Sequence, residues 1–236
     1  MPQGNWPKDT FLYRLREPLR TRILQLGVRR TYPPGHVLLR QGAPGESVWV
    51  LMDALVKISA HTQNGSEALL AIRVSGDVVG EMGALDGSPR SATVTTCGRA
   101  VVFQVKGAVF IDFIRRHPEA ALTLNQMAIE RLRWANQRRL DFTGYGTDVC
   151  LARVLIDLAR RHGTRKDDAL DIGVSLTQTE LGGMVGAKEV TVQKALRGLS
   201  GLGLVQPGHR RVLITDMRGL LRFADLDPRD VSPKPY

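Results

Sequence analysis

The segment from Gly80 to Ala92 holds the residue types that can bind a phosphate. It reads GEMGALDGSPRSA, and its glycines leave backbone N–H groups free to meet an anion. Arg90 can neutralise that anion with a forked pair of donors, and Ser91 offers a hydroxyl beside it. The Glu81 carboxylate can accept a hydrogen bond from a sugar hydroxyl. The residues alone support a phosphate-binding loop and a loop closed by an Arg90–Glu81 pair equally.

A second segment, residues 177–204, has the sequence pattern of a helix-turn-helix. Its second helix, Glu189–Ser200, can read DNA bases. Gln bonds adenine, Lys reaches guanine or phosphate, Glu accepts from cytosine N4, and Val packs on a thymine methyl. A solvated helix face is the alternative, but the preceding helix, the tight turn and the net charge favour DNA. The residues predicted to contact DNA are Thr177, Gln178, Lys188, Glu189, Val190, Thr191, Gln193, Lys194 and Arg197.

A basic turn follows this segment. Val205–Thr215 is predicted to form a two-stranded wing that turns at residues 207–210. His209, Arg210 and Arg211 would then lie where a wing tip meets DNA phosphates. Because basic turns are common, this turn indicates DNA binding only in combination with the predicted helix-turn-helix before it.

The composition is that of a basic globular protein. The 236 residues include 33 Lys and Arg against 23 Asp and Glu, a net charge of +10. Such a field attracts nucleic acid or an acidic membrane surface, although a basic protein without such a partner has the same balance. At roughly 100–200 residues per domain, the length allows one large domain or two modest ones.

Several classes of protein are disfavoured. Cys97 and Cys150 form neither a CxxC motif nor a disulfide framework, which is typical of a reduced cytosol. The five histidines have no metal-ligand spacing, so we expect no metal, haem or iron–sulfur site. Because there is no secretory apolar segment and no run near the ~18 apolar residues of a membrane span, we expect a cytoplasmic protein.

The front half is predicted to be a small β structure after a helical lead-in. Leucines at helical spacing predict a helix within residues 10–30, and residues 31–35 are predicted to turn. Short β-rich runs broken by glycine then extend to residue 107, with an Asn64-Gly65 hairpin signal, and indicate a barrel, roll or sandwich. The predicted strands are Val48–Val50, Val56–His61, Leu69–Val74, Ala92–Thr96 and Ala100–Val105.

A long helical stretch from about Val109 follows the strands. It carries a weak heptad seam, which predicts a dimerisation helix; a lone surface helix is the alternative. Leu140–Gly146, with two glycines around Tyr145, is interpreted as a hinge between domains. The seam residues, spaced alternately four and three apart, are Ala121, Asn125, Ala128, Leu132, Ala135, Arg139 and Phe142.

The back half begins with an amphipathic helix over Asp148–His162 and a charged loop over Thr164–Ala169. Thr177 with Glu180 then forms a capping box at the start of the helix-turn-helix. The predicted domains are a front domain at 1–108, a helix and hinge at 109–143, a winged helix-turn-helix at 144–226 and a flexible tail at 227–236.

From about Tyr32 to Thr215 the chain resembles the family of the cAMP receptor protein and the fumarate–nitrate regulators (CRP/FNR). The resemblance is carried by the Gly80–Ala92 cassette, the Gly76-Asp77 turn and the helix-turn-helix, in that family's order. It implies an α+β fold: a cyclic-nucleotide-binding β-roll of the double-stranded β-helix type, a long dimerisation helix and a winged helix-turn-helix. The implied partners are cAMP or another cyclic nucleotide, palindromic double-stranded DNA, a second copy of the chain and RNA polymerase, and no membrane.

The resemblance also implies a role for each cassette residue. Glu81 would hold the ribose 2′-hydroxyl, and Arg90 and Ser91 would hold the cyclic phosphate with help from the backbone. Arg131 corresponds to a family arginine that approaches Glu81 and the phosphate. The ligand-binding residues implied in this way are Gly80, Glu81, Met82, Gly83, Arg90, Ser91, Arg131, Ala135 and Asn136.

The chain departs from the family pattern in places. The adenine-reading Thr-Ser pair falls on Ala135-Asn136, which leaves the identity of the base open, and a usual glycine of the early strands is replaced at Asp53-Ala54. In the recognition helix the common Ser-Arg-Glu-Thr-Val reads KEVTV, so the operator should differ from that of the best-known member. The iron–sulfur cysteines of the oxygen-sensing branch are absent from the sequence, which argues against that chemistry.

Three alternatives stay open. The first is a regulator of the same fold that is DNA-competent without a nucleotide, with the cassette purely structural. The second is an enzyme acting on phosphate esters, which the sequence disfavours because it offers neither a metal cluster nor an activated nucleophile. The third is a nucleotide module that regulates a partner protein.

Overall fold

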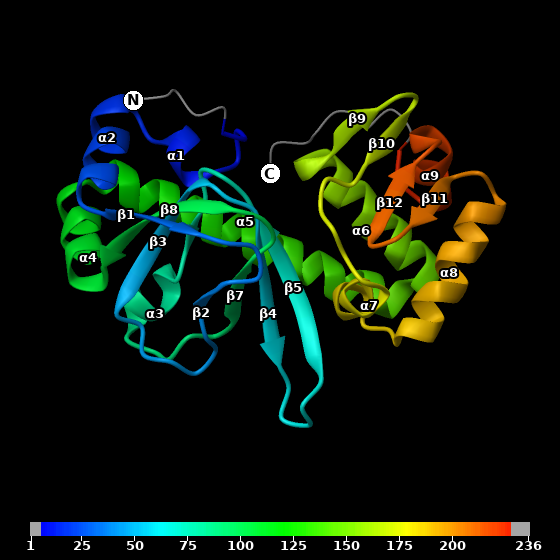
Figure 1. Ribbon diagram of the computed structural model, residues 1–236, viewed down its shortest axis with the longest axis horizontal. Helices are drawn as coiled ribbons and strands as arrows, with labels where there is room; N and C mark the ends of the chain where they lie inside the picture. Colours follow the sequence, from blue (N-terminus) through cyan, green and yellow to red (C-terminus); the bar gives the residue numbers. More distant parts are fainter. Residues whose placement is uncertain (1–5, 228–236) are drawn as a thin grey trace. The chain divides into compact units, whose positions relative to one another are not determined.

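The computed structural model describes residues 6–227, which fall into two compact units (Figure 1). The first unit ends at Leu132 and the second begins at Arg133, so the boundary lies inside one long helix. Within residues 6–227 no helix combines the length and the apolar character needed to cross a membrane. The predicted tail falls, apart from Asp227, outside the described residues.

Two antiparallel four-stranded sheets form the roll of the first unit. Their strand orders are β1-β8-β3-β6 and β2-β7-β4-β5 (Figure 1). The strands of the first sheet are β1 (Val28–Tyr32), β3 (Ser47–Asp53), β6 (Val78–Val79) and β8 (Ala100–Lys106). Those of the second are β2 (Val37–Leu39), β4 (Val56–His61), β5 (Glu67–Arg73) and β7 (Thr93–Thr96).

Strand β3 is buried on both faces, which explains its unbroken apolar run. Val48 and Val50 join the core beneath the helices, whereas Trp49 and Leu51 join the core between the sheets. Successive strand residues point to opposite faces, so a strand covered on both sides must be apolar throughout. The helices of this unit are α1 (Phe11–Arg14), α2 (Glu17–Gln25), α3 (Glu81–Asp86), α4 (Gly107–Arg116) and the first part of α5 (Pro118–Gly144).

The five strands predicted in the front half are confirmed, as is the hairpin at Asn64-Gly65 between β4 and β5. The prediction of one helix over residues 10–30 and a turn over 31–35 is wrong in part. Two short helices end at Gln25, and Val28–Tyr32 pairs with β8, from Val28 opposite Gln104 to Tyr32 opposite Ala100. Pairing along this edge overrides the helical leucine spacing that precedes it.

The second unit is a winged helix-turn-helix. Helices α6 (Thr147–His162), α7 (Gln178–Val185), α8 (Glu189–Gly201) and α9 (Met217–Phe223) accompany a four-stranded sheet of order β11-β12-β10-β9 (Figure 1). The predicted wing is confirmed as β11 (Val205–Gly208) and β12 (Arg211–Ile214). The charged loop predicted at 164–169 is instead a hairpin of β9 (Thr164–Lys166) and β10 (Ala169–Asp171).

Helix α5 runs further than the sequence predicts. It continues through Leu140 to Gly144, so the predicted break at 140–146 shortens to Tyr145 and Gly146 before α6 begins. Large apolar side chains along this helix stay exposed within the described chain, among them Leu132 at 60% and Phe142 at 44%. The helix therefore presents an apolar stripe, and dimerisation through it remains a prediction.

Candidate functional site

The Gly80–Ser91 segment folds tightly back on itself in the first unit. Strand β6 leads into Gly80, whose φ of +81° favours glycine, and helix α3 follows at once. A Cβ on Gly80 would lie 2.9 Å from Arg90 Nη1, and one on Gly83 would lie 2.7 Å from the Ser88 carbonyl oxygen. The close approach of the segment Ser88–Arg90 thus requires these two glycines, and part of the predicted loop is the short helix α3.

Arg90 is a buried cation that lacks a carboxylate partner among the described residues. The residue is only 6% exposed. Its guanidinium donates to two backbone carbonyl oxygens, that of Gly80 at 2.5 Å and that of Ser47. Its Nε finds no hydrogen-bond partner. Burial lowers the pKa of Arg90, and the carboxylates of Glu81 and Glu46 oppose that shift only in part. A buried cation with an unused donor is suited to receive an anion.

Glu81 is paired with Arg131 rather than with Arg90, so the predicted Arg90–Glu81 closing pair is not found. Arg131 Nη1 donates to Glu81, while its Nη2 lies 3.4 Å from Asp77 Oδ1 and 3.2 Å from the Val78 carbonyl oxygen. Burial alone would lower the pKa of Arg131, but Glu81 and Asp77 outweigh it and raise that pKa. The guanidinium thereby fixes the position of the Glu81 carboxylate.

Asp77 is a member of this cluster that the sequence reasoning missed. It is 9% exposed, and burial raises its pKa, although the charges of Arg131 and Arg73 pull that pKa down. The Gly76-Asp77 dipeptide was visible in the sequence only as a turn. A buried carboxylate 54 positions away from its arginine leaves no local pattern that could have revealed the pair.

The remaining predicted ligand residues lie on surfaces. Met82 is 60% exposed and Ser91 is also exposed, beside the buried Arg90. Ala135 and Asn136 are exposed on the part of α5 that belongs to the second unit. The structure therefore brings Gly80, Glu81, Gly83, Arg90 and Arg131 into one cluster, and the role of the others stays a prediction.

The helix-turn-helix of the second unit is built from local signals that the sequence displays. The predicted capping box is present: Glu180 N donates to Thr177 Oγ1 at 3.1 Å, and Thr177 N donates to Glu180 Oε2 at 2.7 Å. Gly186 ends α7 at a φ of +65° and makes the turn into α8. The capping bond uses the Thr177 hydroxyl only as an acceptor, so its O–H can still donate to a ligand.

Helix α8 buries one face and exposes the other, as a recognition helix must. Val192, Leu196 and Leu199 are buried, while Val190 is 74% exposed and so has no packing role inside the unit. All of the residues predicted to contact DNA from this helix and its cap are exposed, namely Lys188, Glu189, Val190, Thr191, Gln193, Lys194 and Arg197.

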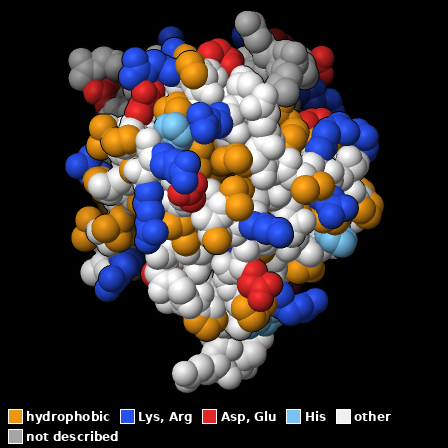
Figure 2. Space-filling model, turned by 90° about the vertical axis from the view of Figure 1, so that its left-hand side faces the viewer, with side chains coloured by type: hydrophobic (Ala, Val, Ile, Leu, Met, Phe, Trp, Pro, Cys, Tyr) orange, Lys and Arg blue, Asp and Glu red, His pale blue; other side chains and the backbone are white. Residues whose placement is uncertain are grey.

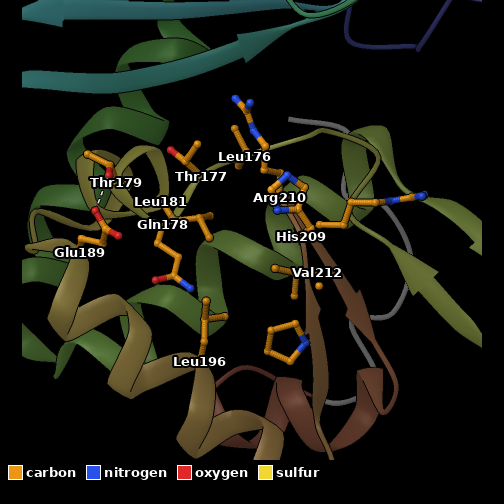
Figure 3. Close-up of a pocket in the computed structure, with 13 residues that line it drawn as sticks. Leu176, Thr177, Gln178, Thr179, Leu181, Glu189, Leu196, His209, Arg210 and Val212 are labelled. Atoms are coloured by element: carbon orange, nitrogen blue, oxygen red, sulfur yellow. Dashed lines mark hydrogen bonds between the residues drawn. The ribbon is translucent and has the colours of Figure 1, made fainter.

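A groove of about 360 Å³ lies between the first turns of α7 and α8 and the β11–β12 hairpin (Figure 3). Gln178 and Glu189 line one side, and His209 and Arg210 line the other. Arg210 forms the tip of the hairpin at a φ of +54°. Arg211 lies next to them, but its Nε is held at 2.9 Å from Asp171 Oδ2, so its predicted phosphate contact competes with an internal ion pair.

On one face of the molecule the basic side chains are scattered. Viewed from the side of α2 and α4, Lys and Arg side chains are scattered among apolar ones without merging into one patch (Figure 2). In the part of the chain that the structure describes, no group of three or more His, Cys, Asp or Glu side chains could hold a metal.

A buried ionic cluster ties the end of α5 to α6 and α9 within the second unit. Asp141 Oδ1 accepts from Arg153 Nη1 at 2.7 Å, and Arg153 Nε donates to the Ala224 carbonyl oxygen at 2.9 Å. The Arg153 guanidinium lies 3.9 Å from the centre of the Tyr145 ring, and the Tyr145 hydroxyl donates to Asp225 at 2.8 Å. This cluster fixes the segment that the sequence suggested as a hinge.

Comparison with known proteins identifies both units. Residues 29–117 match the model of the cyclic nucleotide-binding domain, and residues 151–223 match the Crp-like helix-turn-helix domain. The CRP-like cAMP-activated global transcriptional regulator of Mycobacterium tuberculosis is 31% identical over 193 residues, which cover 82% of this chain and 86% of that protein. The cAMP-activated global transcriptional regulator CRP of Salmonella typhimurium is 25% identical over 194 residues, covering 79% and 89%.

Solved structures share the fold. The c-di-GMP responsive global regulator CLP of Xanthomonas campestris superposes with a TM-score of 0.75 at 19% identity, covering 85% of this chain and all of that one. FixK2 from Bradyrhizobium japonicum superposes with a TM-score of 0.70 at 19% identity, covering 84% and 96%. The predicted order of a β-roll, a long helix and a winged helix-turn-helix is confirmed.

Proposed function

Since this chain belongs to the CRP/FNR family of DNA-binding transcription regulators, which are not enzymes, we propose that it is a homodimer whose affinity for DNA is set by a cyclic nucleotide. The first unit would bind the nucleotide at the Gly80–Ser91 cassette. The second unit would read a palindromic operator in the cytoplasm through α8 and the wing, and RNA polymerase would be the further partner.

The observation that carries the nucleotide proposal is the state of Arg90. A guanidinium this buried normally pairs with a carboxylate, because an unpaired buried charge is costly. Here it meets only two carbonyl oxygens, and its Nε is unused. The glycines beside it leave no room for a Cβ, as in a cradle built for close backbone approach. A cyclic phosphate would supply the missing negative charge.

The other cassette residues have the chemistry to hold a ribose. Glu81, held by Arg131, keeps its second carboxylate oxygen for a sugar 2′-hydroxyl, and Ser91 is exposed beside Arg90 to bond the phosphate. We assign backbone contacts to Gly80, Met82 and Gly83. The base would meet Ala135 and Asn136, and the Asn136 amide can both donate and accept on a base edge. The names of the relatives in Mycobacterium tuberculosis and Salmonella typhimurium favour cAMP.

The DNA-reading surface comprises the exposed face of α8 and the groove beside it. Gln193, Lys194 and Arg197 are exposed on consecutive turns, with polar or basic ends suited to base edges and phosphates. Thr177, Gln178, His209 and Arg210 border the groove, where phosphates would pass. Arg210 stands at the hairpin tip and is the strongest candidate among them for a phosphate contact.

Dimerisation and control would both run through α5. Its exposed apolar stripe, with Leu132 at 60% exposure, can pair with the same stripe of a second copy. Two recognition helices fit a palindrome only if they meet major grooves about 34 Å apart, so a small rotation decides binding. A nucleotide that prefers the DNA-competent arrangement shifts the population by its differential affinity and by no more.

Isothermal calorimetry with cAMP, and with cGMP as the comparison, tests the nucleotide proposal. We expect saturable heat with cAMP, and we expect Arg90→Glu to remove it because two carboxylate oxygens would then face the phosphate. Ser88→Ala is the matched control, since Ser88 is an exposed residue of the same loop whose hydroxyl makes no hydrogen bond within the described chain. No heat with either nucleotide, from folded protein free of carried-over ligand, would favour a regulator that needs no nucleotide.

A further inference from the structure

One hydrogen bond joins the two helices of the helix-turn-helix beside the groove. Thr179 Oγ1 donates to Glu189 Oε2 at 2.8 Å, across ten positions of sequence (Figure 3). Both residues are exposed, and both line the groove between α7, α8 and the wing. Neither the capping of α7 nor the packing of α8 needs this bond, because those depend on Thr177, Glu180 and buried apolar side chains.

The two ends of this bond stand on fixed backbone. Thr179 lies in the first turn of α7, directly between the two capping-box partners. Glu189 is the first residue of α8, whose next turn is anchored by the buried Val192. A glutamate side chain has several rotatable bonds and would otherwise sample many rotamers. The Thr179 hydroxyl selects one orientation of a side chain at the groove surface.

The chemistry of the held carboxylate is one-sided. A carboxylate accepts hydrogen bonds and donates none, and Thr179 uses Oε2 while Oε1 makes no hydrogen bond within the described chain. In the major groove, cytosine N4 and adenine N6 are donors, whereas guanine O6 and N7 and thymine O4 are acceptors. A fixed Glu189 therefore discriminates between bases with and without an exocyclic amino group on the strand that it faces.

We propose that Thr179 is a positioning residue which aims Glu189 at the exocyclic amino group of cytosine or adenine, and so sets the base preference at one operator position. This inference rests on the DNA-reading role proposed for α8. Guanine or thymine at that position would instead place an acceptor of the base opposite the Glu189 carboxylate, which is also an acceptor. A good base contact discriminates by about tenfold to a hundredfold in affinity, and a freely rotating Glu189 would lose most of that factor.

The test is selection of operator sequences from random duplex DNA by the full-length protein, carried out both with saturating cAMP and without nucleotide, followed by titration of the selected duplex and its single-base variants. Fluorescence anisotropy at one fixed salt concentration gives the four affinities at each position. We expect wild type to prefer cytosine or adenine at one position of each half-site. Thr179→Val and Glu189→Gln should both reduce that preference to a few-fold at that same position. Thr179→Ser, which keeps a hydroxyl at this position, should retain the wild-type preference.

A purely structural role for Thr179 gives a different pattern. Thr215→Val is the matched control, since Thr215 is an exposed threonine of the same unit whose hydroxyl donates one bond, at 2.8 Å, away from the groove. Thermal unfolding reports any loss of fold in either variant. An unchanged base profile in Thr179→Val, or a change spread over all positions, overturns the proposal. A wild-type protein that selects no sequence overturns the reading role of α8 itself, and this inference with it.

Discussion

Asp141 is the least exposed charged residue that the structure describes, at 1%, and its replacement tests the energetics of the second unit. Its Oδ1 accepts from Arg153 at 2.7 Å and from Gln137 Nε2 at 3.1 Å. Arg138 Nη2 lies 3.0 Å from Oδ2, which is an ion pair without the alignment of a hydrogen bond. Asp141→Asn keeps the shape of the side chain and removes its charge, so it leaves two arginines without their shared anion.

The expected cost follows from this geometry. Removing one partner of a buried ion pair typically costs about 3–5 kcal/mol, because the other charge stays buried and unpaired. Arg153 would keep its bonds to the carbonyl oxygens of Ala224 at 2.9 Å and Asp225 at 3.3 Å, and its contact with the Tyr145 ring. We therefore expect the lower end of the range, about 3 kcal/mol in the free energy of unfolding.

Urea unfolding followed by circular dichroism measures this effect. With a denaturant slope of about 1–3 kcal/mol per molar, the midpoint of the second unit should fall by about 1 M or more. Asp112→Asn is the matched control, since it breaks an exposed Asp112–Arg116 pair of 2.9 Å that should contribute less than about 1 kcal/mol. Adding Arg153→Met to Asp141→Asn should cost less than the sum of the two single changes.

The prediction is contradicted if Asp141→Asn lowers the midpoint of the second unit no more than Asp112→Asn lowers that of the first unit, in which Asp112 lies. It is also refuted if the double variant loses the full sum of the single losses, because coupling between the two charges is the stated cause. A lower urea midpoint of the first unit, with that of the second unit unchanged, would show that the loss of stability does not come from the cluster around Asp141.

Three further predictions concern single contacts. Arg14→Gln should lower the free energy of unfolding by up to about 1 kcal/mol, because Arg14 and Glu130 form a half-buried bidentate pair at 3.0 and 2.8 Å; an unchanged urea midpoint would contradict this. A hydrogen bond from Arg16 lowers the pKa of Glu119 below 4.5, so this pair stabilises the fold above pH 4.5 and loses its contribution as pH falls through the lowered pKa. Urea midpoints measured across acid pH should lose this contribution to the pH dependence in Arg16→Gln. A pH dependence of the midpoint that is the same in wild type and Arg16→Gln would count against the pair. Arg210→Ala should weaken operator and random DNA alike and reduce the slope of log affinity against log salt by about 1; a change confined to one sequence would point to base reading instead.

Features with local signals could be predicted from the sequence. The Thr177–Glu180 capping box, the wing and the Asn64-Gly65 hairpin each depend on residues a few positions apart, and all three are present. Strands β1 and β9 could not be predicted, because their side chains are mostly exposed and show no alternation of apolar and polar residues. Only their pairing with β8 and β10, which depends on the folded chain, makes them strands.

The candidate sites could also be predicted only in part. The cassette with Arg90 and the exposed face of α8 could be recognised, because each consists of suitable residue types within one short segment. The partners that position those residues were not, since Glu81 and Arg131 are 50 positions apart, and Thr179 and Glu189 are joined across a turn by a single side-chain bond. Arg131 was named only through the family resemblance. Asp141, interpreted from the sequence as part of a hinge between domains, is instead among the most buried residues of its unit and forms an ion pair with Arg153.

The central claim is that a nucleotide controls operator affinity, and one linkage measurement tests it most directly. The affinity of the wild-type protein for its selected operator is measured at fixed salt, without nucleotide and with saturating cAMP. The account predicts an increase of about 5- to 150-fold with cAMP, and an equal increase in cAMP affinity when operator is bound. Equal operator affinities under the two conditions, with protein shown to be free of bound nucleotide, would contradict it.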